Sequence, residues 1–495
     1  MTAGMQRAGT SRTHARLWRE RSWWFFCLAV LFLKFAIFMI DPNPQLFLGD
    51  SASYIWTAVS GWIPPDRSYF YGYIIRWLAI STGSLTLLLL VQTFASAVTA
   101  IVIAYTCRRN LNLAAWPAYS IGILCAIDPL QLVWERYVMT ETISLLLYAV
   151  MLNFAFEYLR TRAMRHLVIV QSLGVVLISF RMSYLLIIQL TAALLPFIGF
   201  LPEIWAALKK DRPKFNIRLR QARMAAAHFA VSVGLMLLLH TGYKHAYAAL
   251  SQRSPEYQHT TGLHLLAFWA PILQETDTTD ERLRSVIRRG DEFGIKDLAR
   301  REAQRFSPGH LVAEWQKLEP DAEEADRIAK ATALRALARA PVSVAALALR
   351  TYIGYWGIDL MVRHAKYDLG HTDLSPEQAA LLAKLFDWVT PPNITAQPLT
   401  LTQRFFTAAW PYYFLLLVSP VVCLMAMCRA DNWSIALVLF AHSGFLIVTL
   451  SVFATAPSVR YLQPVSICCL LSFAALWAAP AKAGTGEARA AAVAM

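Results

Sequence analysis

An isolated acid, Asp50, follows the first strongly apolar stretch of the chain and precedes an aromatic, polar segment from residue 54 to residue 77. Tyr54 and Arg67 belong to this segment. A carboxylate fixed among aromatic rings at a membrane surface can act as a general base on a hydroxyl group. Alternatively, a side-chain oxygen of Asp50 or Ser51 can cap a helix that begins there. Capping and catalysis are compatible, so both roles are open.

Three arginines, Arg136, Arg181 and Arg460, lie in or beside strongly apolar sequence. An arginine at membrane depth costs at least about 2.5–3.5 kcal/mol on insertion scales, so it usually has a partner. A lipid phosphate is a natural partner, because the guanidinium fork can form two parallel hydrogen bonds with phosphate oxygens. The alternative is that each arginine reaches the lipid headgroups separately. The phosphate hypothesis therefore requires the three arginines to converge in the fold.

Two glutamates accompany these arginines. Glu135 directly precedes Arg136, and the two residues also fit an interpretation as solvated loop charges. Glu141 opens an apolar segment, where the dipole of a helix favours a negative charge at its start. A structural role for Glu141 is therefore as well supported as a functional one. No Cys/His spacing in the chain predicts a structural zinc site.

The elements that would position these side chains are membrane-spanning helices. The chain has 495 residues, is 57% hydrophobic and has a mean hydropathy of +0.42, more apolar than a soluble domain needs. Apolar runs of about 20 residues recur, and each can cross about 30 Å of hydrocarbon. We predict an all-α polytopic membrane protein with about ten transmembrane helices, near residues 22–40, 84–106, 112–129, 141–159, 166–180, 184–203, 225–244, 408–427, 433–453 and 461–479.

Basic residues in the short connections predict the orientation of these helices. Arginines and lysines gather in the N-terminal tail and in the second, fourth and sixth connections, so we place that side in the cytoplasm. This asymmetry accounts for most of the net charge of +14, and we therefore expect no nucleic-acid partner. No cysteine lies in a segment predicted to be outside, which argues against a disulfide framework there.

The predicted organisation has five parts. The loop within residues 41–83 is expected to hold two short helices, the first ended by Gly61 and the second between Tyr69 and Ile80. In the later insertion, residues 342–360 fit either a helix at the membrane interface or a further span. The parts are a cytoplasmic tail (1–21), a seven-helix membrane module (22–244) with the catalytic outer loop 41–83, an outer helical insertion (245–407), a three-helix membrane part (408–479) and a second cytoplasmic tail (480–495).

Three short motifs resemble those of the GT-C superfamily of polyprenyl-phosphate-sugar-dependent glycosyltransferases. Gly49-Asp50-Ser51-Ala52-Ser53-Tyr54 resembles the acid-bearing first outer loop of these enzymes. Met139-Thr140-Glu141 is similar to their second loop, and Arg460-Tyr461-Leu462-Gln463-Pro464 resembles the motif that opens their last helix. The superfamily includes protein O-mannosyltransferases and the lipid A aminoarabinose transferase.

The resemblance implies an inverting transfer of a sugar to an acceptor hydroxyl, with Asp50 as the base. The donor would be a polyprenyl-phosphate-linked sugar in the membrane, and the acceptor a lipid, a glycan or a protein. The implied donor-phosphate ligands are Arg136, Arg181, Arg460 and Tyr461, with Tyr54, Arg67, Glu135 and Glu141 in supporting positions. With the Ala/Arg-rich composition, the resemblance implies a bacterial inner membrane protein with its active site facing the periplasm.

The chain departs from the family in its first loop. Many members carry paired acids there, whereas Ser51 follows Asp50 in this sequence. A single base is therefore the simpler interpretation. No cofactor is assured, and dependence on a divalent metal stays open.

Two other classes of function are compatible with this sequence. A flippase or transporter of lipid-linked sugars would show internal repeats and broken helices near the bilayer centre. We find no convincing repeat, and the polar residues gather at one face. An envelope assembly scaffold would use the charged middle of the insertion for protein contacts, although such charge runs usually form solvated helix faces. The enzyme is the preferred prediction.

Overall fold

The computed structural model describes residues 20–209, 215–370, 374–387, 397–429 and 433–478. Within these ranges every regular element is a helix, and Gln45 and Tyr137 form an isolated β-bridge. Most of the predicted N-terminal tail, all of the predicted C-terminal tail and the basic residues between positions 210 and 214 lie outside the described residues. The all-α architecture predicted from the apolar runs is confirmed for the described part of the chain.

Seven helices in the described ranges are long and apolar enough to cross a membrane, or up to nine if each bent pair is one span. The bent pairs are α16 (Ala322–Arg339) with α17 (Pro341–Ile353), at 98°, and α21 (Trp410–Leu417) with α22 (Ser419–Arg429), at 55°. These helices make the chain a multi-pass membrane protein. Four of the seven are the helices α2 (Arg21–Ile40), α5 (Leu85–Arg109), α8 (Glu141–Thr161) and α23 (Trp433–Val452). The other three are Met182–Leu201, which includes most of α10 (Leu185–Lys209), Arg220–Ser251 within α11 (Phe215–Ser251), and Val459–Trp477, in which a 3₁₀ turn leads into α24 (Gln463–Trp477).

The ten predicted spans differ from this set in three places. Helices α6 (Ala115–Ala126) and α9 (Met164–Phe180) are apolar but have only 12 and 17 residues. At about 1.5 Å per residue, α6 is about 18 Å long, well short of the hydrocarbon thickness. The predicted span 408–427 corresponds to the bent pair α21–α22 rather than to one straight helix.

The helix ends separate into two groups, as an alternating bundle requires. At one end, Arg109 and Arg160 both pair with Glu157, and Arg108 pairs with Glu20. These arginines belong to the basic connections that we predicted to share one side. The other end brings together the segments after α2 and α9 and those before α8 and α24, which carry the candidate site residues.

The first loop contains both predicted short helices. Helix α3 (Leu48–Ser60) ends at Gly61, whose φ of +76° suits a residue without a side chain. Helix α4 (Phe70–Ile75) continues into a π-helical turn, Arg76–Ile80. At the start of α3, the hydroxyl oxygen of Ser51 accepts a hydrogen bond from the backbone N–H of Phe47, at 2.8 Å, and the Asp50 carboxylate does not. The capping role considered for Asp50 is therefore wrong, and its carboxylate is available for other contacts.

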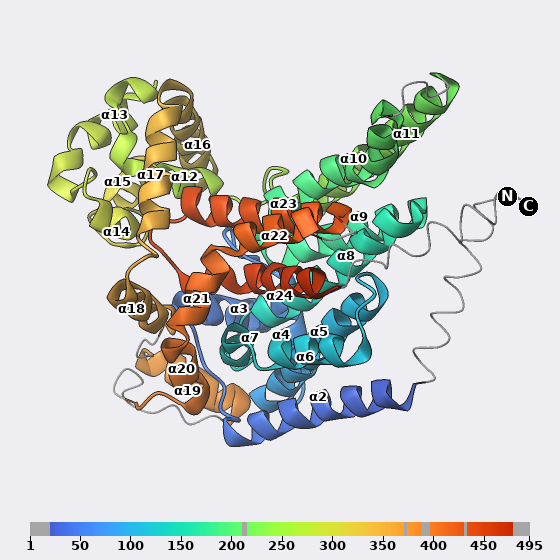
Figure 1. The fold of residues 1–495 in the computed structure, drawn as a ribbon. Coiled ribbons are helices and arrows are strands. Elements are labelled where there is room, and N and C mark those ends of the chain that lie inside the picture. The colour runs from blue at the N-terminus through green and yellow to red at the C-terminus, as the bar shows by residue number, and fades with distance from the viewer. Residues whose placement is uncertain (1–19, 210–214, 371–373, 388–396, 430–432, 479–495) are drawn as a thin grey trace, which may run out of the picture.

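The insertion begins with a helical lobe that has its own apolar core around Leu266, Leu283 and Trp315. Figure 1 shows this lobe beside the membrane helices, while the paired helices α10 and α11 project away from the bundle. The 13-residue α17 packs against α23. It lies in residues 342–360, for which the sequence left open an interfacial helix or a further span. The lobe contains α12 (Thr261–Phe268), α13 (Glu281–Arg288), α14 (Arg301–Phe306), α15 (Leu311–Leu318) and α16, and α18 (Ile358–Asp368), α19 (Pro376–Phe386) and α20 (Leu401–Ala408) follow α17.

Candidate functional site

Asp50 lies in the first turn of α3 and pairs with arginines from two different parts of the chain. Its Oδ1 is 2.6 Å from Nη1 of Arg67, which belongs to the same loop. Its Oδ2 is 3.2 Å from Nη1 of Arg460, which lies just before the last helix. The Asp50 side chain is 27% exposed, so a ligand can still reach the carboxylate. The residues proposed as base and phosphate ligand are thus in direct contact.

Glu141 lies behind Arg460, away from solvent. It is the first residue of α8 and is fully buried. Its Oε1 pairs with Nε of Arg460 and lies 3.6 Å from Nη2 of Arg181. Gln463 also accepts a hydrogen bond from Arg181, at 3.5 Å. Glu141 therefore holds two of the three predicted phosphate-binding arginines beside each other.

Aromatic rings contact both guanidinium groups. The Arg460 guanidinium carbon is 4.5 Å from the ring centre of Phe47 and 5.7 Å from that of Trp134. Arg181 lies 5.6 Å from the ring centre of Tyr461. Such cation–π contacts stabilise a cation most where water is excluded. They help to hold the two guanidinium groups in place beside the rings.

Arg67 is clamped from its other side by Asp66. The Asp66 carboxylate accepts from Nε at 2.9 Å and from Nη2 at 2.7 Å. Burial raises the pKa of Asp66, but the hydrogen bonds and charge of Arg67 outweigh it, and the pKa lies below its usual value. The Asp66 carbonyl accepts from Gln258 of the insertion at 2.8 Å. Arg67 is therefore a fixed, charged partner for Asp50.

Tyr54 follows Asp50 by one turn of α3 and is buried. Its ring packs edge-on against Tyr71, with 5.1 Å between the ring centres. Burial and the nearby Asp50 charge both raise the pKa of Tyr54 well above its usual value. The phenol is therefore neutral at physiological pH. The contacts of Tyr54 support the wall of the site and give it no role as a base.

Arg136 does not share the ion-pair partners of Arg181 and Arg460. Arg136 and Glu135 are fully buried, which also excludes the interpretation as solvated loop charges. Nη2 of Arg136 lies 3.3 Å from Glu135, and Nη1 donates to Thr93 at 2.8 Å. The other oxygen of Glu135 is 2.7 Å from Nζ of Lys34 on α2. A buried lysine is stable only with an opposite charge nearby. Glu135, which directly follows Trp134 at the end of a short helix, is that charge.

Two charged residues escaped the sequence analysis. Lys34 had a signal, because a lone lysine inside the first apolar run already indicates a buried acidic partner. Asp368, at the end of α18, had none, since it stands in no recognisable motif. Its carboxylate accepts from the backbone N–H of Arg460 at 3.0 Å and from the Ser458 hydroxyl at 2.9 Å. Only the fold brings Asp368 to the site.

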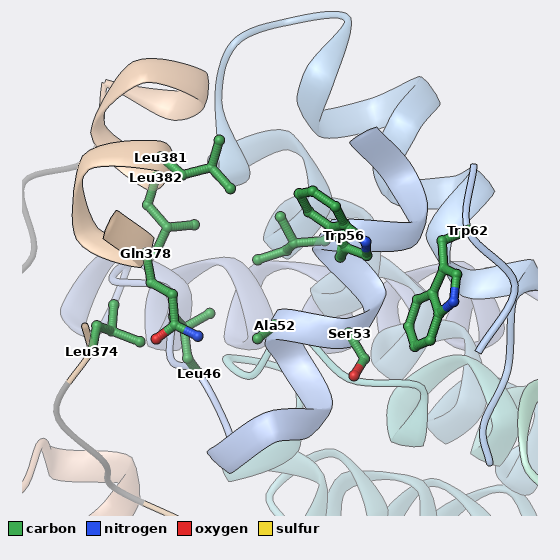
Figure 2. A pocket seen from close by; sticks show the side chains of 10 residues that line it. Leu46, Ala52, Ser53, Trp56, Trp62, Leu374, Gln378, Leu381 and Leu382 are labelled. Carbon is green, nitrogen blue, oxygen red and sulfur yellow. The ribbon is translucent and has the colours of Figure 1, made fainter. Parts of the chain in front are cut away.

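An apolar groove of about 280 Å³ lies along α3 (Figure 2). Helix α19 forms its opposite wall, and Trp62 lies beyond the end of α3. Ser53 and Gln378 are its polar lining residues. The same short helix thus carries Asp50 and one wall of a groove. The lining residues are Leu46, Ala52, Ser53, Ile55, Trp56, Trp62, Leu374, Gln378, Leu381 and Leu382.

The cluster of Asp50, Asp66, Glu141, Arg67, Arg181 and Arg460 contains equal numbers of carboxylate and guanidinium groups. Its arginines can bind an anion, and one of its carboxylates can accept a proton from a neighbouring hydroxyl group. Among the described residues, no group of three or more His, Cys, Asp or Glu side chains could hold a metal ion. No protein-family model, curated protein or solved structure matches the chain.

Proposed function

We propose that this chain is a GT-C-like membrane glycosyltransferase that moves a sugar from a polyprenyl-phosphate donor to an acceptor hydroxyl, with inversion at the anomeric carbon. The observation that carries the proposal is the contact of Asp50 with Arg460, whose guanidinium also pairs with Glu141, the partner of Arg181. A candidate base is thereby placed next to candidate phosphate ligands. The site faces the periplasm of a bacterial inner membrane in this proposal, opposite the basic helix ends.

The reaction begins when the donor phosphate binds the free N–H groups of Arg460 and Arg181. An anion there competes with Asp50 for Arg460 and releases Oδ2 of the carboxylate. Asp50 then takes the proton of the acceptor hydroxyl, and the acceptor oxygen bonds to the anomeric carbon. The bond from that carbon to the phosphate oxygen breaks, and its electron pair leaves with the polyprenyl phosphate.

Each group has a defined contribution to the rate. General-base assistance by Asp50 is worth roughly 10²–10⁴-fold. Arginines already oriented toward the leaving phosphate contribute about 3 kcal/mol or more, because they need little rearrangement as its charge develops. Arg67 stays paired with Asp66 throughout and keeps the Asp50 carboxylate in place.

A transporter of lipid-linked sugars is the main alternative. The bend of 55° between α21 and α22 favours it, since transporters often bind substrate at broken helices. The paired charges of the candidate site instead gather at the end of the bundle, beside the reachable Asp50 carboxylate. This position favours an enzyme that acts at the membrane surface. A scaffold role for the charged insertion is compatible with either function.

The test is release of polyprenyl phosphate from a panel of polyprenyl-phosphate sugars by purified protein in lipid nanodiscs. Lipid, glycan and peptide acceptors are supplied together. Asp50→Asn keeps the size of the side chain but loses basicity, and we expect at least about a hundredfold loss of release. Asp66→Asn is the matched control, since it also removes a carboxylate from Arg67 but leaves the base in place.

We expect the control to lose less than about tenfold, the size of a partly exposed ion pair. Equal losses in both variants would assign the effect to the position of Arg67 rather than to a base. Near-normal turnover of Asp50→Asn would remove Asp50 from the mechanism. Absence of release from every donor by folded protein would overturn the enzyme and favour the transporter.

A further inference from the structure

The insertion between the two membrane parts contacts the candidate site through α18. Asp368, the last residue of this helix, is 4% exposed. One carboxylate oxygen accepts the backbone N–H of Arg460, and the other accepts the hydroxyl of Ser458. Both partners lie in the turn that leads into the last helix.

The same turn has a second support from the insertion. The hydroxyl of Tyr355 accepts from the Ser458 amide at 2.9 Å and donates to the Ser458 carbonyl at 3.2 Å. Tyr355 is fully buried. Two side chains of the insertion therefore fix the backbone on both sides of Val459, directly before the guanidinium that contacts Asp50.

We propose that Asp368 is a positioning residue for Arg460 and that its charge regulates how tightly the donor phosphate binds there. The inference rests on the proposed function, and it assigns the insertion a working part in the site. Asp368 acts through the backbone of Arg460, so it does not have to touch the substrate.

The contacts of Asp368 can persist in both protonation states. In the ionised form, its two oxygens accept the two hydrogen bonds as described. In the neutral form, one oxygen still accepts from Arg460, while the carboxyl proton can be donated to the Ser458 hydroxyl, which has acceptor capacity. Position is thus retained in both states, whereas the negative charge near Arg460 is present only in the ionised state.

The surroundings of Asp368 move its ionisation into the physiological range. Burial raises the pKa of Asp368 to about 7, although the hydrogen bonds from Arg460 and Ser458 and the Arg460 charge oppose this shift. Among the described residues, four phenols also interact with its charge: Tyr355, Tyr461, Tyr367 and Tyr413. An anionic phosphate at Arg460 repels the ionised carboxylate, so donor binding should weaken as pH rises through about 7.

The experiment compares Asp368→Asn and Asp368→Ala with the wild type. Asparagine reproduces the neutral carboxyl, because its carbonyl accepts from Arg460 and its amide donates to Ser458. Donor KM and kcat are measured from pH 5.5 to 8.5. In the wild type we expect donor KM to rise by about tenfold for each pKa unit by which phosphate binding raises the pKa of Asp368.

In Asp368→Asn, donor KM should be flat with pH and equal to the low-pH value of the wild type. In Asp368→Ala, donor KM should be raised at every pH, because the backbone N–H of Arg460 loses its partner. A wild-type pH profile in Asp368→Asn would overturn the regulatory role. Unchanged donor KM in Asp368→Ala would overturn the positioning role, and if this variant does not fold, Ser458→Ala provides the positioning test.

Binding of free polyprenyl phosphate to nanodisc-embedded protein separates this inference from the proposed reaction. Free polyprenyl phosphate is a phosphomonoester with its own second pKa near about 6, so the readout is the ratio of the affinities of the wild type and Asp368→Asn at each pH. Wild-type affinity that falls relative to that of Asp368→Asn as pH rises through about 7 supports the inference, even if no donor is turned over. A ratio that does not change with pH overturns it, even if transfer is observed. Absence of binding would overturn the inference together with the phosphate site.

Discussion

Replacing Glu141 by glutamine tests whether the two arginines of the site are poised for an anion. Glu141 is fully buried, and its nearest contact with Arg181 is 3.6 Å, worth about 5 kcal/mol at an effective dielectric constant of about 20. Part of this energy is recovered because glutamine buries no charge. We therefore expect Glu141→Gln to lose about 3 kcal/mol of stability, the low end of the cost of breaking a buried ion pair.

Polyprenyl phosphate should also stabilise Glu141→Gln against thermal unfolding more than it stabilises the wild type. Without the Glu141 charge, an anionic phosphate can compensate the positive charge of Arg181 and Arg460, so binding becomes more favourable. A polyprenyl phosphate concentration one hundred times the dissociation constant stabilises a folded protein by about 2.7 kcal/mol. Thermal unfolding in nanodiscs, with and without polyprenyl phosphate, measures both the loss and its recovery.

Glu157→Gln is the matched control at the other end of the same helix. Glu157 is also buried and pairs with Arg109 and Arg160. We expect a loss of stability, but no additional recovery with polyprenyl phosphate. If Glu141→Gln is as stable as the wild type, or if both variants recover equally with the lipid, the assignment of Arg181 and Arg460 to a phosphate site is refuted.

Further outcomes can be measured by thermal unfolding or ligand binding. Arg460→Ala should weaken polyprenyl phosphate binding by at least about tenfold, and unaltered affinity would indicate a structural role only. Burial and the Arg305 charge lower the pKa of His264 to about 4, so stability present above pH 6.5 should be lost as pH falls through about 4. His264→Gln should flatten this dependence. Gly262→Ala should cost about 2 kcal/mol or more, since its Cβ would clash with the Asp326 carbonyl oxygen. Gly234→Ala, with open space, should gain up to about 1 kcal/mol.

Local chemistry explains why the helices were predictable. Each apolar run satisfies its backbone hydrogen bonds within itself, so the run alone predicts a helix in a membrane. Gly61 marked the end of α3 because its left-handed conformation suits glycine. The number of spans was less predictable, since hydropathy does not reveal that α6 is short or that α21 and α22 meet at a bend.

The sequence also indicated which charges would matter, because an acid or arginine beside an apolar run requires a partner. Arg181 and Arg460 were named on that basis, Asp50 as a candidate base and Glu141 as the acid that opens an apolar segment, and the fold brings the four together. Which charge pairs with which could not be deduced. Arg136 met the same criterion, yet the fold gives it Glu135 as a partner.

The sequence by itself determined a membrane protein made of helices, the two short helices of the first loop and the residue types available for chemistry. The tertiary structure alone decided that Asp368 accepts a hydrogen bond from the Arg460 backbone and that Glu135 pairs with Lys34. The physical reason is that helix formation depends on neighbours along the chain. Ion pairing instead depends on which helix ends meet in space, and a buried charge pairs with whichever opposite charge the packing places within reach.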